Sequence, residues 1–347
     1  MLIVILYLYL ALFTCHLLEF WSIPILKSSF FAILYGIFLP LILLHLSPKG
    51  FYLACNLLGV SSSSTAKLGF KVPKETTIYG LEQGVLNLVR PNLWMNMGYW
   101  KNTQDFQVAC KALVSMVAET AHFKSGDTIL DVGYGCGDQD IYLQEEYKLS
   151  KIVGFTLEPV QQVVAKQKVS ELKLDETIQL ELGDAAQIST LLASKGLPTT
   201  YDRVISIDSA YHYNTRASFL QQSFDHLRSG GSIGLADIIL ARKPHTWLGQ
   251  TVLKLICSAS EIPYENMVSE VEYREMLERL GYTEITLVPI DEDVFPRLAD
   301  FIDRQEHIFD GLVASTIWMK LSVMKHLLRF VYHKHWLHFV IVSGKKV

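Results

Sequence analysis

Apolar runs alternate with amphipathic stretches along the chain after residue 105. The runs have the length of strands, and the stretches between them carry apolar residues at helical spacing. The predicted strands are 128–132, 151–155, 178–182, 202–207, 232–239, 285–290 and 337–343, and the predicted helices are 105–122, 139–147, 160–172, 216–227 and 271–280. Strands that alternate with helices form a largely parallel sheet with its ligand at the carboxyl ends of the strands. The pattern therefore predicts an α/β, Rossmann-like domain, with a lid at 241–268 where the alternation loosens.

The first predicted strand contains Asp131 and ends in a turn with glycines at Gly133, Gly135 and Gly137. Glycines let the backbone approach a nucleotide-like ligand where a Cβ would collide. A dinucleotide fingerprint would need its third glycine at position 138, where this chain has Asp138. A carboxylate at a helix N-terminus would repel a diphosphate, whereas it suits a ligand with an amino acid moiety and a sulfonium charge. The spacing favours S-adenosylmethionine over NAD.

The first 60 residues differ from the rest, because they hold only three charged residues, Glu19, Lys27 and Lys49. Two runs without Asp, Glu, Lys or Arg, at 1–18 and 28–46, are each close to the roughly 20 apolar residues that span a bilayer. We expect a membrane anchor of one or two helices over residues 1–60. A cleaved signal peptide and a buried or interfacial hairpin are the competing interpretations.

A serine-rich stretch follows the apolar segment, and residues 61–74 are predicted to link it to a domain at 75–347. The lysines after the second apolar run place this domain in the cytosol by the positive-inside rule, at the endoplasmic reticulum or a similar membrane.

Charge and cysteine content exclude several classes of protein. The net charge of −4 provides no basic footprint for nucleic acid. The five cysteines are scattered and lack C-x-x-C spacing, so we expect neither a disulfide framework nor a metal site. In the segment 312–338, basic residues lie on one face of a predicted helix and apolar residues on the opposite face. This pattern predicts the last helix of the sheet's outer layer; the alternative is a helix that lies at a membrane surface. The four basic residues of that face are Lys320, Lys325, Arg329 and Lys334.

Six segments, in order along the chain, resemble class I S-adenosylmethionine-dependent methyltransferases. DVGYGCG resembles their first motif, LELGDAAQ the segment that contacts the adenine, DRVISIDSAYHYNTR the fourth-strand motif, and HFVIVSGKK the antiparallel seventh strand. NLWMNMGYW, AYHYNTR and IPYENMVSEVEYREMLERLGY are similar to small-molecule methyltransferases of natural-product and lipid pathways, including the macrolide O-methyltransferases. The resemblance covers about residues 75 to 345 and implies a seven-stranded methyltransferase sheet.

The resemblance also implies roles at the methyl donor. Gly133, Gly135 and Gly137 would line it, Asp131 would support its methionine end, and Asp184 with Ala185 would meet the adenine.

The ribose site departs from the common family pattern, which places an acidic residue at the tip of the second strand. This chain has Thr156 there, within GFTLEPVQ. A similar segment occurs in cyclopropane-fatty-acid synthase relatives, which implies that Thr156 and Gln161 hold the ribose, with Glu158 as an alternative.

Tyr99 and Trp100 precede the first strand and are candidates to close over the methionine end by cation–π contact. Packing in the core is the equally weighted alternative.

His212 directly follows the fourth predicted strand, at the edge where the acceptor is expected. A neutral imidazole there can accept a proton from an acceptor hydroxyl. The alternative is that His212, between two tyrosines, only hydrogen-bonds the loop. If the acceptor atom is an alkene carbon, Glu82, Asp208 and Tyr211 are rival bases.

These features predict methyl transfer to a small apolar or amphipathic acceptor: a lipid, sterol, terpenoid or polyketide, at O, C or N. Two other functions stay open, an NAD(P)-dependent oxidoreductase and a non-catalytic protein that binds S-adenosylmethionine.

Overall fold

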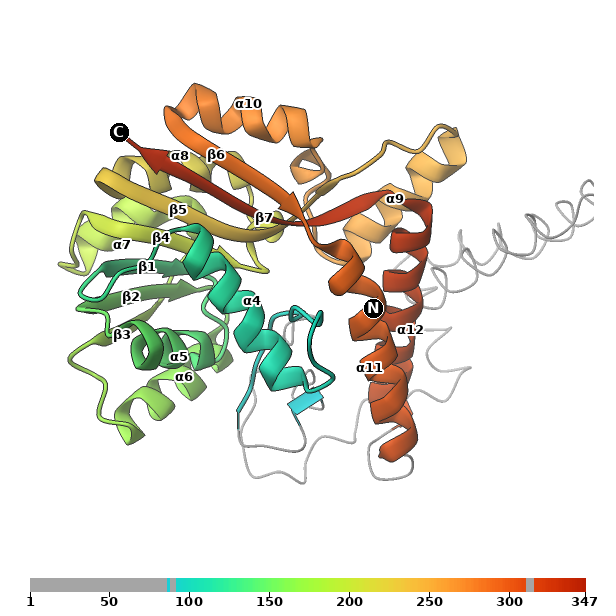
Figure 1. Cartoon of the computed structure of the whole chain (residues 1–347), viewed down its shortest axis with the longest axis horizontal. Helices are drawn as coiled ribbons and strands as arrows, with labels where there is room; N and C mark the ends of the chain where they lie inside the picture. Colours follow the sequence, from blue (N-terminus) through green and yellow to red (C-terminus); the bar gives the residue numbers. More distant parts are fainter. Residues whose placement is uncertain (1–85, 88–91, 310–314) are drawn as a thin grey trace, which may run out of the picture. The chain divides into compact units, whose positions relative to one another are not determined.

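A computed structural model describes residues 86–87, 92–309 and 315–347 of the chain (Figure 1). The predicted anchor at 1–60 and linker at 61–74 lie outside these ranges. Of the helices formed within them, none combines the length and the apolar character needed to cross a bilayer.

The described residues form a seven-stranded sheet in the order β3-β2-β1-β4-β5-β7-β6. The strands are β1 (Thr128–Val132), β2 (Lys151–Thr156), β3 (Ile178–Leu182), β4 (Tyr201–Ile207), β5 (Leu227–Leu240), β6 (Tyr282–Pro289) and β7 (Leu337–Lys346). The first five strands are parallel, and β7 is antiparallel to both β5 and β6. The predicted α/β sheet with an antiparallel last strand is confirmed.

Helices cover both faces of this sheet (Figure 1). They are α4 (Phe106–Thr120), α5 (Asp138–Tyr147), α6 (Pro159–Glu171), α7 (Ile188–Ser194), α8 (Arg216–His226), α9 (Trp247–Ala259), α10 (Glu270–Leu280), α11 (Phe295–Ile308) and α12 (Ser315–Lys334). Short 3-10 turns lie at Ala185–Gln187, Ala210–His212, Tyr264–Asn266 and Asp291–Asp293. A helix, α9, thus occupies the predicted lid, while α7 and α11 were not predicted.

The alternation of side chains along β5 sets the two layers. A Cβ at Gly234 would lie 2.7 Å from Ala121 Cβ, so the missing side chain lets the C-terminal end of α4 approach the sheet. The next residue, Leu235, points to the opposite face and joins a core that includes Tyr273 and Leu277 of α10. The α10 helix begins with a capping box at Ser269 and ends at a left-handed glycine, which fixes its length.

Strand β6 begins three residues earlier than predicted. Glu284 has a left-handed φ of 50°, and the register against β7 shifts between Thr283 and Thr286. Such a bulge interrupts the two-residue periodicity that marks a strand, so the sequence pattern reveals only the part after it.

The basic face predicted for α12 is not simply solvated. Lys325 is buried and pairs with Asp303 Oδ1 at 2.6 Å and Glu306 Oε2 at 2.5 Å. Arg329 pairs with Asp300 Oδ1 at 2.7 Å and also with Asp303. The acidic residues of α11 recur at helical spacing and neutralise the middle of this face. The helices α11 and α12 pack against each other and do not lie on a face of the sheet (Figure 1).

Candidate active site

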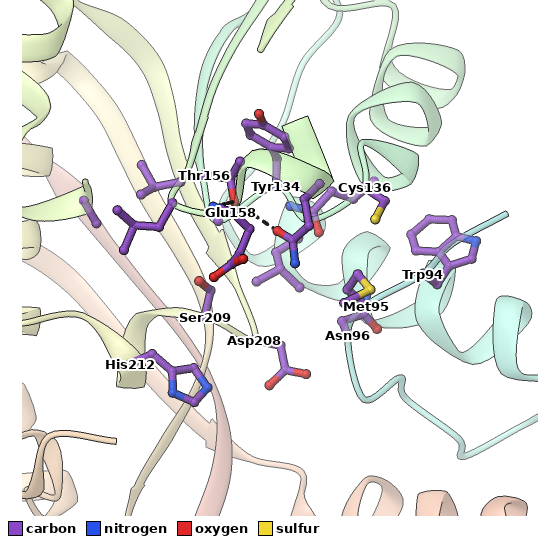
Figure 2. Close-up of a pocket in the computed structure, with 18 of the residues that line it drawn as sticks. Trp94, Met95, Asn96, Tyr134, Cys136, Thr156, Glu158, Asp208, Ser209 and His212 are labelled. Atoms are coloured by element: carbon purple, nitrogen blue, oxygen red, sulfur yellow. Dashed lines mark hydrogen bonds between the residues drawn. The ribbon is translucent and has the colours of Figure 1, made fainter. Parts of the chain in front are cut away.

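A cavity of about 410 Å³ opens at the carboxyl ends of the parallel strands. Its lining comes from the turn after β1, the ends of β2, β3 and β4, the segment 93–97, and single residues of α11 and α12. Figure 2 shows Glu158, Ser209, Asp208 and His212 on one side of this space, and Trp94, Met95 and Asn96 on the other. Ligands of parallel α/β sheets bind at this edge, so the cavity is the candidate active site.

Gly133 and Gly135 form part of the cavity wall, and both have a left-handed φ, of 88° and 61°. A Cβ at Gly133 would lie 2.6 Å from Ser209 Cβ and 2.8 Å from the Tyr213 hydroxyl. The backbone therefore approaches both the ligand space and the loop after β4, as only glycine permits. Gly137 does not line the cavity. Its missing Cβ lets α5 approach Ala165 of α6, so its placement indicates helix packing rather than contact with a ligand.

Asp138 lines the cavity at the start of α5, but its charge is not free to act on a ligand. Its Oδ2 atom pairs with Lys168 Nζ at 2.5 Å and accepts a hydrogen bond from Leu93 N at 3.0 Å. Because Lys168 offsets its charge, Asp138 would repel a diphosphate less than the sequence alone predicts. The argument from glycine spacing is unaffected.

Two buried carboxyl groups, Asp131 and Asp140, lie next to each other beneath the glycine turn. Gln139 donates a hydrogen bond to Asp131 Oδ2 at 2.6 Å. Neither Asp131 Oδ1 nor the two Asp140 oxygens accept from any N–H or O–H of the described residues. Burial raises the pKa of Asp131 to about 6, and burial together with the Asp131 charge raises that of Asp140 well above its usual value. Both carboxyl groups therefore ionise less readily than exposed carboxylates do.

The end of β2 brings Thr156, Glu158 and Gln161 to the cavity. The Thr156 hydroxyl is buried and donates to Gln161 Oε1 at 3.0 Å, and it accepts from Glu158 N at 3.3 Å. In Figure 2 the Glu158 carboxylate points into the cavity beside Ser209. The threonine thus positions its two neighbours, which offer an amide and a carboxylate to a ligand.

Asp184 and Ala185 also line the cavity, after β3. Asp184 caps the following turn by accepting a hydrogen bond from Ala186 N at 2.8 Å, which fixes this wall.

Asp208 joins the end of β4 to the segment before α4. Its Oδ2 atom accepts from Met97 N at 2.6 Å, and its Oδ1 atom accepts from the Tyr211 hydroxyl at 2.7 Å. Burial raises the pKa of Asp208 to about 6. The residue has a left-handed φ of 58°, which is uncommon outside glycine and typical of functional sites.

His212 lines the cavity next to Tyr211, with their ring centroids 4.1 Å apart. Burial lowers the pKa of His212 to about 4, so the imidazole is neutral at neutral pH. Its Nδ1 atom lies 3.2 Å from the Glu261 carbonyl oxygen. Because a carbonyl only accepts, Nδ1 carries the proton and Nε2 is the basic nitrogen. The ring therefore has the tautomer that a general base needs.

Asn266 holds the loop of Tyr211 and His212 from the lid side. Its Nδ2 atom donates to Tyr211 O at 2.9 Å and to Tyr213 O at 2.8 Å. Arg216, which is 1% exposed, pairs with Asp237 at 3.0 Å and donates to the Asn266 carbonyl. A buried network of hydrogen bonds and one ion pair thus fixes the loop of Tyr211 and His212.

Tyr99 and Trp100 do not line the cavity. Trp100 is 3% exposed; its Nε1 atom donates to Met97 O, and its ring lies 5.1 Å from that of Phe301 in α11. The expectation that this pair closes over the methyl donor is not met by their placement, because the turn at Gly98 sends both residues toward α4 and α11. Met95, Asn96 and Met97 of the same segment line the cavity instead.

Several other lining residues were not predicted, and they come from distant parts of the chain: Glu261, Leu298 and Met324. No local pattern marks Leu298 or Met324, which look like ordinary apolar positions of amphipathic helices. In the described ranges, no group of three or more histidine, cysteine, aspartate or glutamate side chains is arranged to hold a metal ion.

Several known proteins are similar to this chain. The family model for mycolic acid cyclopropane synthetase matches residues 91–282. The erythromycin 3''-O-methyltransferase of Saccharopolyspora erythraea is 30% identical over 237 residues, which are 66% of this chain and 75% of that enzyme. The cyclopropane-fatty-acyl-phospholipid synthase of Escherichia coli is 27% identical over 125 residues, 36% of this chain and 29% of that one.

The solved structure of the cyclopropane synthase MmaA2 from Mycobacterium tuberculosis superposes with a TM-score of 0.62. The match covers 77% of this chain and 95% of that one at 15% identity, and at this identity the likeness shows the fold alone.

Proposed function

The chain belongs to the mycolic acid cyclopropane synthetase family of S-adenosylmethionine-dependent methyltransferases, and we propose that its acceptor is a small lipophilic or amphipathic molecule. It is an enzyme that transfers a methyl group from S-adenosylmethionine to a small molecule. We also propose roles for individual residues and attachment of the enzyme to a membrane.

The cavity fits the methyl donor by three features. At Gly133 and Gly135 the backbone itself forms the cavity wall, packed so closely that a Cβ would collide with neighbouring side chains. The Asp131–Asp140 pair does not line the cavity, but its carboxyl groups, buried beneath the glycine turn, provide negative potential that suits the positive charge of the sulfonium. We assign the ribose hydroxyls to Gln161 and Glu158, held by Thr156, and the adenine to Asp184 and Ala185.

When bound, S-adenosylmethionine supplies a methyl group already activated by a sulfonium. The protein mainly has to orient the methyl donor and the acceptor, exclude water and take a proton from the acceptor. His212 Nε2 is our candidate for the atom that takes this proton, with the ring oriented by the Glu261 carbonyl. Asp208 orients Tyr211 and fixes Met97 at the opposite wall. We infer that an acceptor hydroxyl lies between His212 and the glycine turn.

The observation that carries the acceptor class is the lining of the remaining wall. It is made by Met95, Met97, Phe106, Leu298 and Met324. None of these side chains offers a strong polar contact, and methionine adapts to apolar ligands of varied shape. The same wall supports an acceptor that partitions into membranes, in agreement with the apolar residues 1–60 and our proposal of a membrane-anchored, cytosol-facing enzyme.

The two other functions are not favoured. The spacing of Gly133, Gly135 and Gly137 does not fit the dinucleotide fingerprint of an NAD(P)-dependent oxidoreductase. A non-catalytic binding protein would not need the neutral, oriented imidazole of His212.

The test is incubation of the purified full chain with S-adenosylmethionine labelled in the methyl group and a lipid extract of its host. We expect label in one lipid-soluble product, identified by mass spectrometry, and none with a variant that no longer binds the methyl donor. Label that appears only in water-soluble compounds contradicts the proposed acceptor class.

A further inference from the structure

Helix α9 carries apolar side chains on two faces. Val252, Leu253, Ile256 and Cys257 are buried against the domain. On the other side Trp247 is 74% exposed, Leu255 50% and Leu248 39%. Single exposed apolar residues are common on protein surfaces, but these three share one helix, and the largest is the most exposed. We call Trp247, Leu248 and Leu255 the α9 patch.

The α9 patch lies in a segment whose only charged residues are basic. No aspartate or glutamate lies between Asp237 and Glu261 in the sequence, while Arg242, Lys243 and Lys254 all do. These three side chains are exposed and form no ion pair with a described residue. Arg242 donates to the Lys334 carbonyl at 3.2 Å, Lys254 lies 5.2 Å from the centroid of the Tyr264 ring, and the charge of Lys243 acts on Glu272. In Figure 1 the segment that leads from β5 into α9 reaches away from the sheet. The cations are therefore available to a partner at the same place as the apolar side chains.

We propose that the α9 patch docks on an anionic membrane surface. Tryptophan prefers the boundary between headgroups and acyl chains, and leucines beside it can enter the same layer. Basic residues at the edge of such a patch contact lipid phosphates. The combination of an aromatic tip, aliphatic neighbours and exposed cations matches this surface better than the face of a second copy, because that face would bring the same cations together.

Docking through α9 would place a bilayer close to the cavity. The helix leads at its C-terminal end to Glu261, which lines the cavity and whose carbonyl oxygen contacts His212 Nδ1. A lipophilic acceptor could then pass from the bilayer to the imidazole along a short path. This last step rests on the proposed function, whereas the docking itself does not.

The experiment places a photo-crosslinker on the full chain. The photoreactive p-benzoylphenylalanine replaces Trp247 or, in a second variant, Leu255, and the matched control replaces Val163 of α6, an apolar residue that is 66% exposed on another element. Each protein is irradiated with vesicles of phosphatidylcholine, with or without phosphatidylserine, and the adducts are identified by mass spectrometry. We expect lipid adducts at 247 and 255 that exceed those at 163 several-fold and increase with phosphatidylserine.

Three results would overturn the proposal: lipid adducts no more frequent at 247 than at 163, adducts with residues 1–85 of the same chain, or adducts with a second copy. The control at 163 matters because residues 1–60 alone could hold the chain at a membrane in any orientation.

A charge-reversed variant with Arg242→Glu and Lys243→Glu, carrying the crosslinker at 247, tests the electrostatic part. Adducts with phosphatidylserine vesicles should fall several-fold, while binding of S-adenosylmethionine is unchanged; adducts that persist at the original level contradict the role of these cations. If adducts form as expected but no lipid becomes methylated, the docking stands and the proposed acceptor class fails.

Discussion

The two sides of the cavity are built in different ways. The side that we assign to the methyl donor comes from consecutive strand–helix units, between Val132 and Ala185. The acceptor side combines segments from Met95 to Met324, which only the packing of the whole domain brings together. A wall made of consecutive units can stay constant while the other wall changes, because the second depends on appended helices. We therefore expect substitutions in the second wall to change the acceptor without changing the methyl donor.

The two sides meet at Gly133, and the largest expected effect is there. Gly133→Val would force a side chain into Ser209 and Tyr213 in a backbone conformation with a φ of 88°. Strain and overpacking together cost roughly 4 kcal/mol of folding free energy, and relief of that cost would displace the turn that forms the cavity wall, so we expect binding of S-adenosylmethionine to weaken at least about a hundredfold. Calorimetry measures the affinity. Gly126→Val is the matched control, since Gly126 has a φ of 86° and open space around it. Equal losses in both variants would show that strain alone matters.

The second prediction breaks the acceptor side alone. His212→Ala should lower kcat by about 100-fold, as expected for loss of a general base, and leave the affinity for S-adenosylmethionine unchanged. Because the pKa of His212 is lowered to about 4, its basic form is present above that pH and is lost only as the pH falls through it. The acid limb due to His212 should therefore lie near pH 4, not near 6.5. An unchanged turnover with the identified acceptor would refute the role.

The third prediction concerns the support of the acceptor loop. Asn266→Ala removes two hydrogen bonds to the carbonyls of Tyr211 and Tyr213, so the loop loses its fixed position. We expect kcat to fall about tenfold with little change in affinity for the methyl donor. Asn266→Asp keeps the size but lacks the amide donor and should behave like the alanine variant. A fall in thermal stability without a fall in kcat would indicate a structural role only.

The smallest effect is expected on the methyl-donor side, at Thr156. Thr156→Val keeps the shape but removes the hydroxyl that donates to Gln161, which should weaken S-adenosylmethionine binding about fivefold. Thr156→Ser should restore most of the affinity. A serine variant as weak as the valine variant would show that the methyl group, not the hydroxyl, is required.

The methyl-donor side was also the more predictable side. The strand at Asp131 and the turn at Gly133 are local patterns, and they directly encode a buried strand and a close backbone approach. Trp100 was misplaced because Gly98 turns the chain, and its direction depends on α11, a helix that the pattern did not reveal. Leu298 and Met324 carry no signal, since an apolar residue of an amphipathic helix looks alike in a core and in a cavity wall.

The Asp131–Asp140 pair has a consequence for turnover. S-adenosylmethionine is a sulfonium, whereas the product left after methyl transfer has a neutral sulfur, so the ligand loses one positive charge in each cycle. Burial raises the pKa of Asp131 to about 6 and that of Asp140 well above its usual value, and a cation near the pair lowers the pKa of both carboxyl groups. The pair should therefore release part of a proton when the substrate enters and recover it when the spent product remains. It would act as an adjustable counter-charge that favours exchange of the product for a fresh molecule.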